Sequence, residues 1–156
     1  MKKIIIIIST YLITLIFGFG LGVYFLPIII AEKSQSIQEI ENIKKQATYE
    51  TEFKKGQRGN DFFHWGEGKV YISNEYISLK GQISPGPDYK IYLLKNFVEH
   101  EDEFIPVKSD AIFVSDLKLF KNFVIKVPVD VKVSDYNTIL IWCEKFKEFI
   151  TSAKYK

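Results

Sequence analysis

The sequence has 156 residues, 47% hydrophobic and 15% aromatic, enough for one domain with its own core and an additional segment. Its 21 basic and 19 acidic side chains leave a net charge of +2, which excludes the large positive field that nucleic-acid binding requires. One cysteine and two histidines exclude an intramolecular disulfide and a cysteine-rich zinc site, and we expect no metal site.

An apolar segment opens the chain. Lys2 and Lys3 are followed by residues 4–30, which contain no charged side chain. This stretch exceeds the roughly 20 residues that cross a bilayer core and the roughly 7–15 of a signal-peptide core. We therefore expect a signal anchor, a transmembrane helix at residues 1–31 that contacts the lipid bilayer through residues 4–30. Cleavage after Ala31 is the alternative, because a small residue ends the apolar run.

The charges around this segment predict its orientation. Lysines precede it, whereas Glu32 and Lys33 cancel just after it, so the positive-inside tendency places the N-terminus in the cytoplasm. We expect a single-pass membrane protein whose C-terminal domain is extracytoplasmic, in the periplasm or at the cell surface. Gly18 and Gly22 form a Gly-x-x-x-Gly pair, which permits close helix contact, although glycine is common in membrane helices in any case.

Residues 32–56 are polar with a narrow apolar stripe. Ile37, Ile40, Ile43 and Ala47 recur at three- and four-residue intervals, which is helical spacing. We expect a short helical stalk or linker that lifts the domain off the membrane. Docking of the same stripe on the domain, or pairing with a second copy, are the alternatives that the spacing leaves open.

Residues 57–156 contain short runs typical of β-strands. Alternating runs at 69–73 and 76–80 predict a tight hairpin. Pro85 and Gly86 suit the central positions of a type II turn. Further strands are expected at 89–94, 111–114, 123–129, 138–143 and in the tail from 146 to 153. About seven or eight short antiparallel strands with no helix between them predict an all-β fold, a β-sandwich or barrel.

The run Thr138–Cys143 is apolar on both sides, with Leu140 and Trp142 on one side and Ile139, Ile141 and Cys143 on the other. Such a strand is expected to have both faces covered. It ends in the only cysteine of the chain.

Cys143 is the candidate catalytic residue, a redox thiol or a ligand. Such a thiol must be partly exposed, and its thiolate must be favoured. Lys145 and Lys147 would favour the thiolate, and Glu144 would oppose it. The alternative is a small buried hydrophobic residue, because free cysteine is among the most buried residue types.

Each of the two histidines has a functional and a structural interpretation. His64, flanked by Phe63 and Trp65, is the candidate second ligand or acid–base partner of the thiol. The alternative is a histidine hydrogen-bonded at the start of a strand. His100 lies among four carboxylates in Glu99–Glu103, which could attract calcium. The run lacks the spaced ligands and turn glycine of a calcium loop, so a solvated acidic hairpin is favoured.

Several of these pieces occur together in one known family. They are Phe62-Phe63-His64, Gly68-Lys69-Val70, Pro85-Gly86-Pro87-Asp88 with the strand up to Leu93, Asp116-Leu117, Val127-Pro128 and Ile139-Leu140-Ile141-Trp142-Cys143-Glu144-Lys145-Phe146. In this order they resemble the DM-thirteen domain, also called the electron-transfer DM domain, of Skeletor-type proteins, over residues 57–156. The family's usual glycine-rich segment after Asp-Leu is replaced here by residues 118–122.

The resemblance implies an extracytoplasmic β domain with a redox or electron-transfer role centred on Cys143. The cysteine would act as a bare thiol or as a ligand to a group such as haem, with His64 as helper. An unidentified redox or envelope protein would be its partner. The alternative is a non-catalytic interaction module of the cell envelope in which Cys143 is buried and structural. No motif of a conventional hydrolase or nucleotide enzyme is present.

Overall fold

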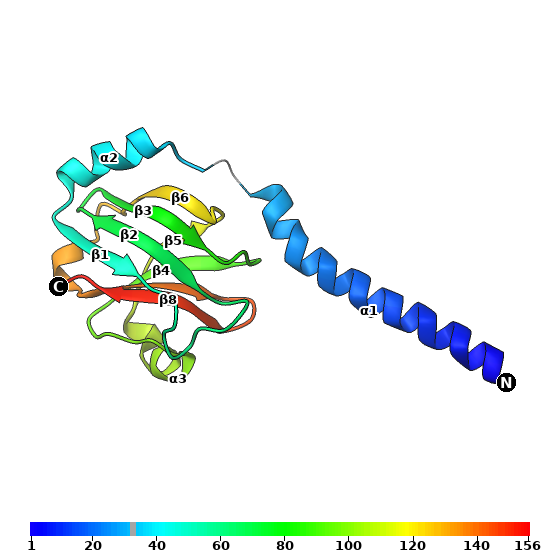
Figure 1. Ribbon diagram of the computed structural model, residues 1–156. Coiled ribbons are helices and arrows are strands. Elements are labelled where there is room, and N and C mark those ends of the chain that lie inside the picture. Colours follow the sequence, from blue (N-terminus) through cyan, green and yellow to red (C-terminus); the bar gives the residue numbers. More distant parts are fainter. Residues whose placement is uncertain (32–33) are drawn as a thin grey trace.

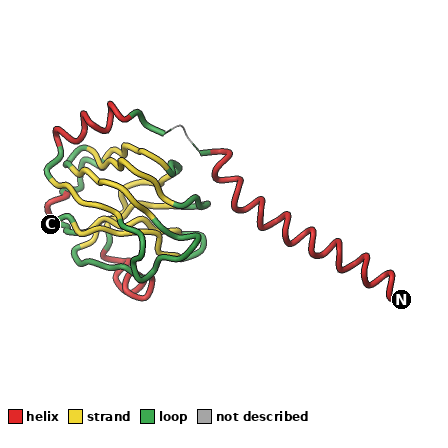
Figure 2. The backbone as a smooth tube through the Cα atoms, in the orientation of Figure 1, coloured by secondary structure: helices red, strands yellow, loops and turns green. Residues whose placement is uncertain are grey.

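Antiparallel strands dominate the C-terminal two thirds of the chain. The structure is a computed structural model that describes residues 1–31 and 34–156. Eight strands form two four-stranded sheets, ordered β1-β2-β3-β6 and β5-β4-β7-β8, which lie face to face (Figures 1 and 2). They are β1 (Tyr49–Phe53), β2 (Gly66–Ile72), β3 (Tyr76–Ile83), β4 (Tyr89–Leu94), β5 (Ile112–Leu117), β6 (Lys121–Lys126), β7 (Thr138–Cys143) and β8 (Glu148–Lys154). The prediction of an all-β, sandwich-like fold is confirmed, although a short helix, α3 (Glu101–Phe104), lies between β4 and β5, where we expected none.

Strand β7 lies between β4 and β8, and all six of its residues are buried. Ile139, Ile141 and Cys143 belong to the main core between the two sheets. Leu140 and Trp142 belong to a second apolar cluster on the outer side of their sheet. The elements beside that cluster are the short helix α3 (Glu101–Phe104) and the 3-10 helix η1 (Ile105–Asp110). The expectation that both faces of this strand are covered is therefore confirmed.

The strand predictions hold with shifted ends. The expected hairpin is β2–β3, and its turn is closed by a 2.9 Å hydrogen bond from the Ser73 N–H to the Tyr76 carbonyl oxygen. The ambiguous tail forms β8, a strand at the edge of its sheet. The strand expected to reach Val129 ends at Lys126, because Pro128 cannot donate to the ladder.

Residues 34–56 do not form a free stalk. Helix α2 (Ile37–Gln46) begins with a capping box between Ser36 and Glu39 and lies on the β1-β2-β3-β6 sheet, where Ile40 is fully buried. A 2.7 Å ion pair joins Glu41 to Lys80 of β3. The docked alternative is thus the observed one. Strand β1 also lies in the expected linker, because Tyr-Glu-Thr-Glu-Phe alternates as an edge strand does.

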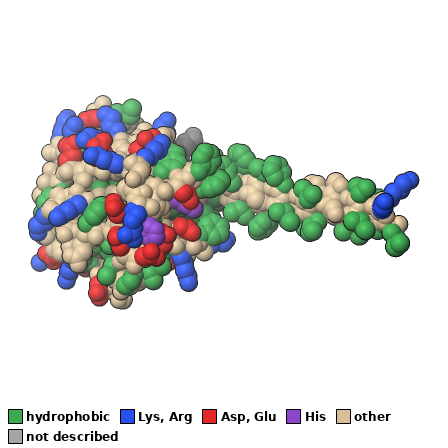
Figure 3. Space-filling model, turned by 60° about the horizontal axis from the view of Figure 1, so that its bottom comes forward, with side chains coloured by type: hydrophobic (Ala, Val, Ile, Leu, Met, Phe, Trp, Pro, Cys, Tyr) green, Lys and Arg blue, Asp and Glu red, His purple; other side chains and the backbone are tan. Residues whose placement is uncertain are grey.

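The expected apolar helix is present as α1 (Lys2–Ile30). Its most apolar window has a mean hydropathy of 2.5 and is not buried against the rest of the chain. Hydrophobic side chains stand along much of the helix, and basic side chains mark its N-terminal end (Figure 3). Length and composition suit a membrane span, and a signal sequence shares both properties. Glu32 and Lys33, which enter the orientation argument, lie outside the described residues.

Candidate functional site

Three loops at one end of the sandwich enclose a cavity of about 540 Å³. The loops are residues 60–65 between β1 and β2, 84–88 between β3 and β4, and 144–147 between β7 and β8. Cys143 and His64 both line the cavity, and residues of α1 including Phe19 and Tyr24 complete its wall. The fold therefore brings together the two candidate residues, which are far apart in the sequence.

Cys143 lies where the main core meets this cavity. It pairs with Tyr89 of β4 and Glu148 of β8, and only 1% of the residue is exposed. Burial raises the pKa of the thiol, although the backbone N–H groups of Phe146 and Lys145 oppose the shift. The thiol is therefore protonated at neutral pH, and it needs a base before it can react as a thiolate.

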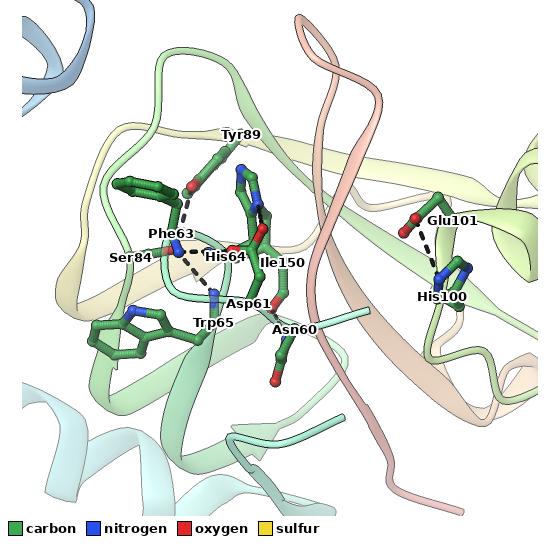
Figure 4. Close-up of polar contacts among 10 residues, drawn as sticks. All are labelled: Asn60, Asp61, Phe63, His64, Trp65, Ser84, Tyr89, His100, Glu101 and Ile150. Carbon is green, nitrogen blue, oxygen red and sulfur yellow. Dashed lines mark hydrogen bonds and ion pairs between the residues drawn. The ribbon is translucent and has the colours of Figure 1, made fainter. Parts of the chain in front are cut away.

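His64 is held by a carboxylate three residues before it. Its Nδ1 lies 3.0 Å from Oδ2 of Asp61, whose Oδ1 accepts 2.7 Å hydrogen bonds from the N–H groups of Phe63 and His64 (Figure 4). Burial would raise the pKa of Asp61, but these hydrogen bonds leave it below its usual value. An ionised Asp61 accepts a hydrogen bond from the Nδ1–H group of a neutral imidazole, so that Nε2 is the acceptor nitrogen.

Tyr89 forms a second buried wall of the cavity. Its hydroxyl lies 3.4 Å from Oγ of Ser84, which also accepts a 3.1 Å hydrogen bond from the Trp65 N–H (Figure 4). Burial raises the pKa of Tyr89, so its hydroxyl stays protonated. The ring lies against Gly86, where an added Cβ would stand 2.3 Å from its atoms.

The expected type II turn at Pro85-Gly86 is wrong. Such a turn requires a positive φ at its third residue, and Gly86 is not among the residues with positive φ. Glycine is required at this position because the Tyr89 ring occupies the space of a side chain. Pro85 and Gly86 do lie in the loop that separates β3 from β4, as expected. Gly86 is needed there for packing and not for a positive φ.

Glu144, which follows Cys143 directly, points to a different environment. Its carboxylate accepts hydrogen bonds from the Tyr92 hydroxyl and from Nζ of Lys108. Burial would raise the pKa of Glu144, but these two partners hold it below its usual value. The charge that we expected to oppose a Cys143 thiolate is therefore neutralised locally by Lys108.

His100 lies outside this site. It caps helix α3 by accepting a 3.2 Å hydrogen bond at Nδ1 from the Asp102 N–H, and its Nε2 lies 3.3 Å from Glu101 (Figure 4). The expected acidic hairpin is instead a helical turn. Within the described residues, no group of three or more His, Cys, Asp or Glu side chains could hold a metal ion.

Haem is the group that the family resemblance raised, and the two candidate residues differ in how they suit it. His64 has the carboxylate-held Nδ1 and free Nε2 that a ligating histidine requires. Cys143 does not fit as a thiolate ligand, because burial raises its pKa and leaves it almost fully covered. The residues present therefore do not fit a group held by both side chains.

Two residues of the site were not singled out from the sequence. Asp61 carries a weak local signal, because it lies three residues before His64. This spacing allows a carboxylate and an imidazole to pair across a turn. Tyr89 carries no such signal, because its place depends on the pairing of β4 with Cys143 at the end of β7.

Comparison with known proteins agrees with the resemblance. No curated protein and no solved structure matches the chain. The family model described as electron transfer DM13, which is the DM-thirteen family, matches residues 52–155. The match covers β2 to β8, the end of β1 and the three loops that border the Cys143 cavity. The chain therefore belongs to the electron transfer DM13 family.

Proposed function

We propose that this chain is a membrane-anchored, extracytoplasmic redox domain in which Cys143 is the reactive group and His64 is its proton acceptor. The observation that carries the proposal is their shared cavity, assembled from loops far apart in the sequence. Membership of a family described as electron transfer supports a redox-related role. Helix α1 has the length and composition of the anchor.

The chemistry of the pair explains why both residues are needed. A buried thiol with a raised pKa is protonated at neutral pH and gives up electrons poorly in that form. Asp61 holds Nδ1 of His64 and leaves Nε2 free. In the proposed role, Nε2 takes the thiol proton across the cavity that both residues line. A one-electron acceptor carried by a partner redox protein then takes one electron from the sulfur while the thiol proton passes to the imidazole, which leaves a thiyl radical, an imidazolium and a reduced acceptor.

The test is alkylation of Cys143 in the folded, full-length chain. N-ethylmaleimide is small and uncharged, and it should modify the native protein at neutral pH. His64→Gln should slow the reaction by roughly tenfold or more, in keeping with loss of a general base. His100→Gln is the matched control and should leave the rate unchanged. Modification only after denaturation, or equal rates in both variants, would count against the proposed roles.

A non-catalytic interaction module is the second candidate, and one observation favours it. Cys143 is 1% exposed and belongs to the main core, as a structural cysteine would. In that case Cys143→Ser lowers the unfolding free energy by about 1 kcal/mol or more through a buried hydroxyl. The native thiol is then inert towards N-ethylmaleimide, and His64→Gln leaves that inertness unchanged.

A further inference from the structure

Three exposed aromatic side chains, which we call the aromatic tip, lie at the cavity end of the sandwich. Phe62 is 86% exposed, Phe63 56% and Phe146 49%. They come from the loops 60–65 and 144–147, which both border the Cys143 cavity. Exposed phenylalanine side chains gathered at neighbouring loops are typical of a surface that contacts a protein, a membrane or a ligand.

The aromatic tip lies beside the second half of α1. The ring of Tyr24 meets the ring of Phe63 edge to face, with centroids 6.4 Å apart. A second cavity, of about 560 Å³, lies between Phe62, Phe63 and helix residues that include Ile16 and Phe25. The loop 60–65 therefore faces a helix whose own apolar surface is exposed.

The length of α1 gives the depth of this contact. Its 29 residues span about 43 Å at about 1.5 Å per residue, whereas the hydrocarbon core of a bilayer is about 30 Å thick. Counted from Ile4, about 20 residues cross that core, which ends close to Tyr24. Aromatic residues favour this membrane–water interface. Tyr24 and the adjoining Phe63 are thus placed at interfacial depth.

Charge supports the same placement. Phe146 stands between Lys145 and Lys147, and all three are exposed in the turn between β7 and β8. Lysines beside an inserted aromatic ring can keep their ammonium groups at the level of the lipid phosphates. Asp61, the carboxylate that directly precedes Phe62 in the sequence, is already paired with His64.

We propose that the aromatic tip inserts into the bilayer interface next to the C-terminal part of α1, as a second membrane contact. The proposal rests on the proposed anchoring by α1 and is independent of any redox step at Cys143. The cavity end of the domain then contacts the membrane. The Cys143 cavity, one wall of which is α1, borders the lipid phase.

Tryptophan quenching by brominated lipid tests this placement in the full-length chain. The chain is reconstituted into nanodiscs of phosphatidylcholine and phosphatidylglycerol, with and without bromine near the head of the acyl chains. Phe62→Trp is compared with Val129→Trp. Val129 follows β6, is 97% exposed, and lies near the β2–β3 turn, at the other end of the sandwich from the aromatic tip. Phe17→Trp reports insertion of α1 itself, and the wild-type signal is subtracted throughout.

The proposal predicts several-fold stronger quenching of Phe62→Trp than of Val129→Trp, with Phe17→Trp also quenched. Quenching of Phe17→Trp alone would overturn tip insertion while leaving the anchor in place. Absence of quenching at all three positions would overturn the anchor and the insertion together. Neither result bears on the reactivity of Cys143.

A second measurement tests cooperation between the two loops. In Phe146→Trp, replacing Phe62 and Phe63 by Asp should reduce the quenching several-fold, because the charged loop leaves the interface. The double replacement should keep the thermal unfolding midpoint, since both side chains are exposed. Unchanged quenching at position 146 with an intact fold would contradict insertion of a common tip.

Discussion

The two sides of the sheet at β7 differ in how their neighbouring side chains are surrounded. On the outer side, Trp142 packs against Phe104 with ring centroids 4.8 Å apart, and Glu144 is held by Tyr92 and Lys108. On the inner side, Cys143 stands at the wall of a cavity. One side is closed by packing and charge pairing, and the other retains a space beside a thiol.

The difference separates the side chains that stabilise the fold from those that line the proposed site. The outer cluster stabilises the position of β7 and satisfies the carboxylate next to the cysteine. On the inner side, Cys143 lines the same cavity as His64 and Tyr89, and the charge of Glu144 is paired on the other side. Adjacent residues in one strand and its turn therefore divide between structure and the proposed chemistry.

The largest effect is expected from Trp142→Ala on the closed side. Removing a fully buried indole should lower the unfolding free energy by about 3–5 kcal/mol, measured by urea denaturation. Phe113→Ala is the control, because this ring is 46% exposed on β5 and should cost much less. Equal losses of unfolding free energy in the two variants would show that Trp142 does not pack more tightly than the half-exposed Phe113.

Gly86→Ala should act on the cavity side with an intermediate effect. The added Cβ would collide with the Tyr89 ring, so we expect a loss of about 1–3 kcal/mol and a changed rate of Cys143 alkylation. Thermal unfolding and the N-ethylmaleimide rate measure the two consequences. Asp88→Ala in the same loop adds no atoms and serves as control for stability alone, because the Asp88 charge also raises the pKa of the Cys143 thiol. A neutral Gly86→Ala would refute the close approach.

Glu144→Gln should have a smaller, pH-dependent effect of about 1 kcal/mol. The pKa of Glu144 is lowered in the fold from its ordinary 4.5. Its ionised form therefore contributes stability above that value, and the contribution is lost as the pH falls through the folded pKa. Wild type should lose more stability on acidification than Glu144→Gln. A Glu75→Gln control, in an exposed turn, should follow wild type, and parallel profiles for all three would contradict the pairing.

The smallest effect concerns Cys143 in alkali. Its pKa is raised from 9.0, so the neutral thiol contributes stability below pH 9.0 that is lost as the pH rises through the folded pKa. Wild type should therefore lose slightly more stability above pH 9.0 than Cys143→Ala. Chemical denaturation across this range measures the difference, and identical slopes would indicate a thiol that is not buried.

Most of the fold could be predicted because its signals are local. Alternation identified the β2–β3 hairpin, and a run apolar on both sides identified β7 as a central strand. Strand β1 was missed because two glutamates on its exposed face make it resemble a polar linker. The position of α2 depends on a sheet surface that its own sequence does not describe.

The site could be predicted only in part. Cys143 and His64 were identifiable by residue type, whereas their common cavity depends on loops from three hairpin or crossover connections. The orienting Asp61 follows from a turn geometry that spacing alone does not fix. The role of Gly86 could not be inferred, because it depends on the final position of the Tyr89 ring.

Oxidation of Cys143 in the folded chain tests the central claim most directly. Hydrogen peroxide converts a thiolate to a sulfenic acid, which dimedone traps and mass spectrometry assigns to a residue. We predict trapping at Cys143 in the native full-length protein and a several-fold lower rate in His64→Gln than in His100→Gln. Trapping only after unfolding, or at equal rates in the two histidine variants, would contradict it.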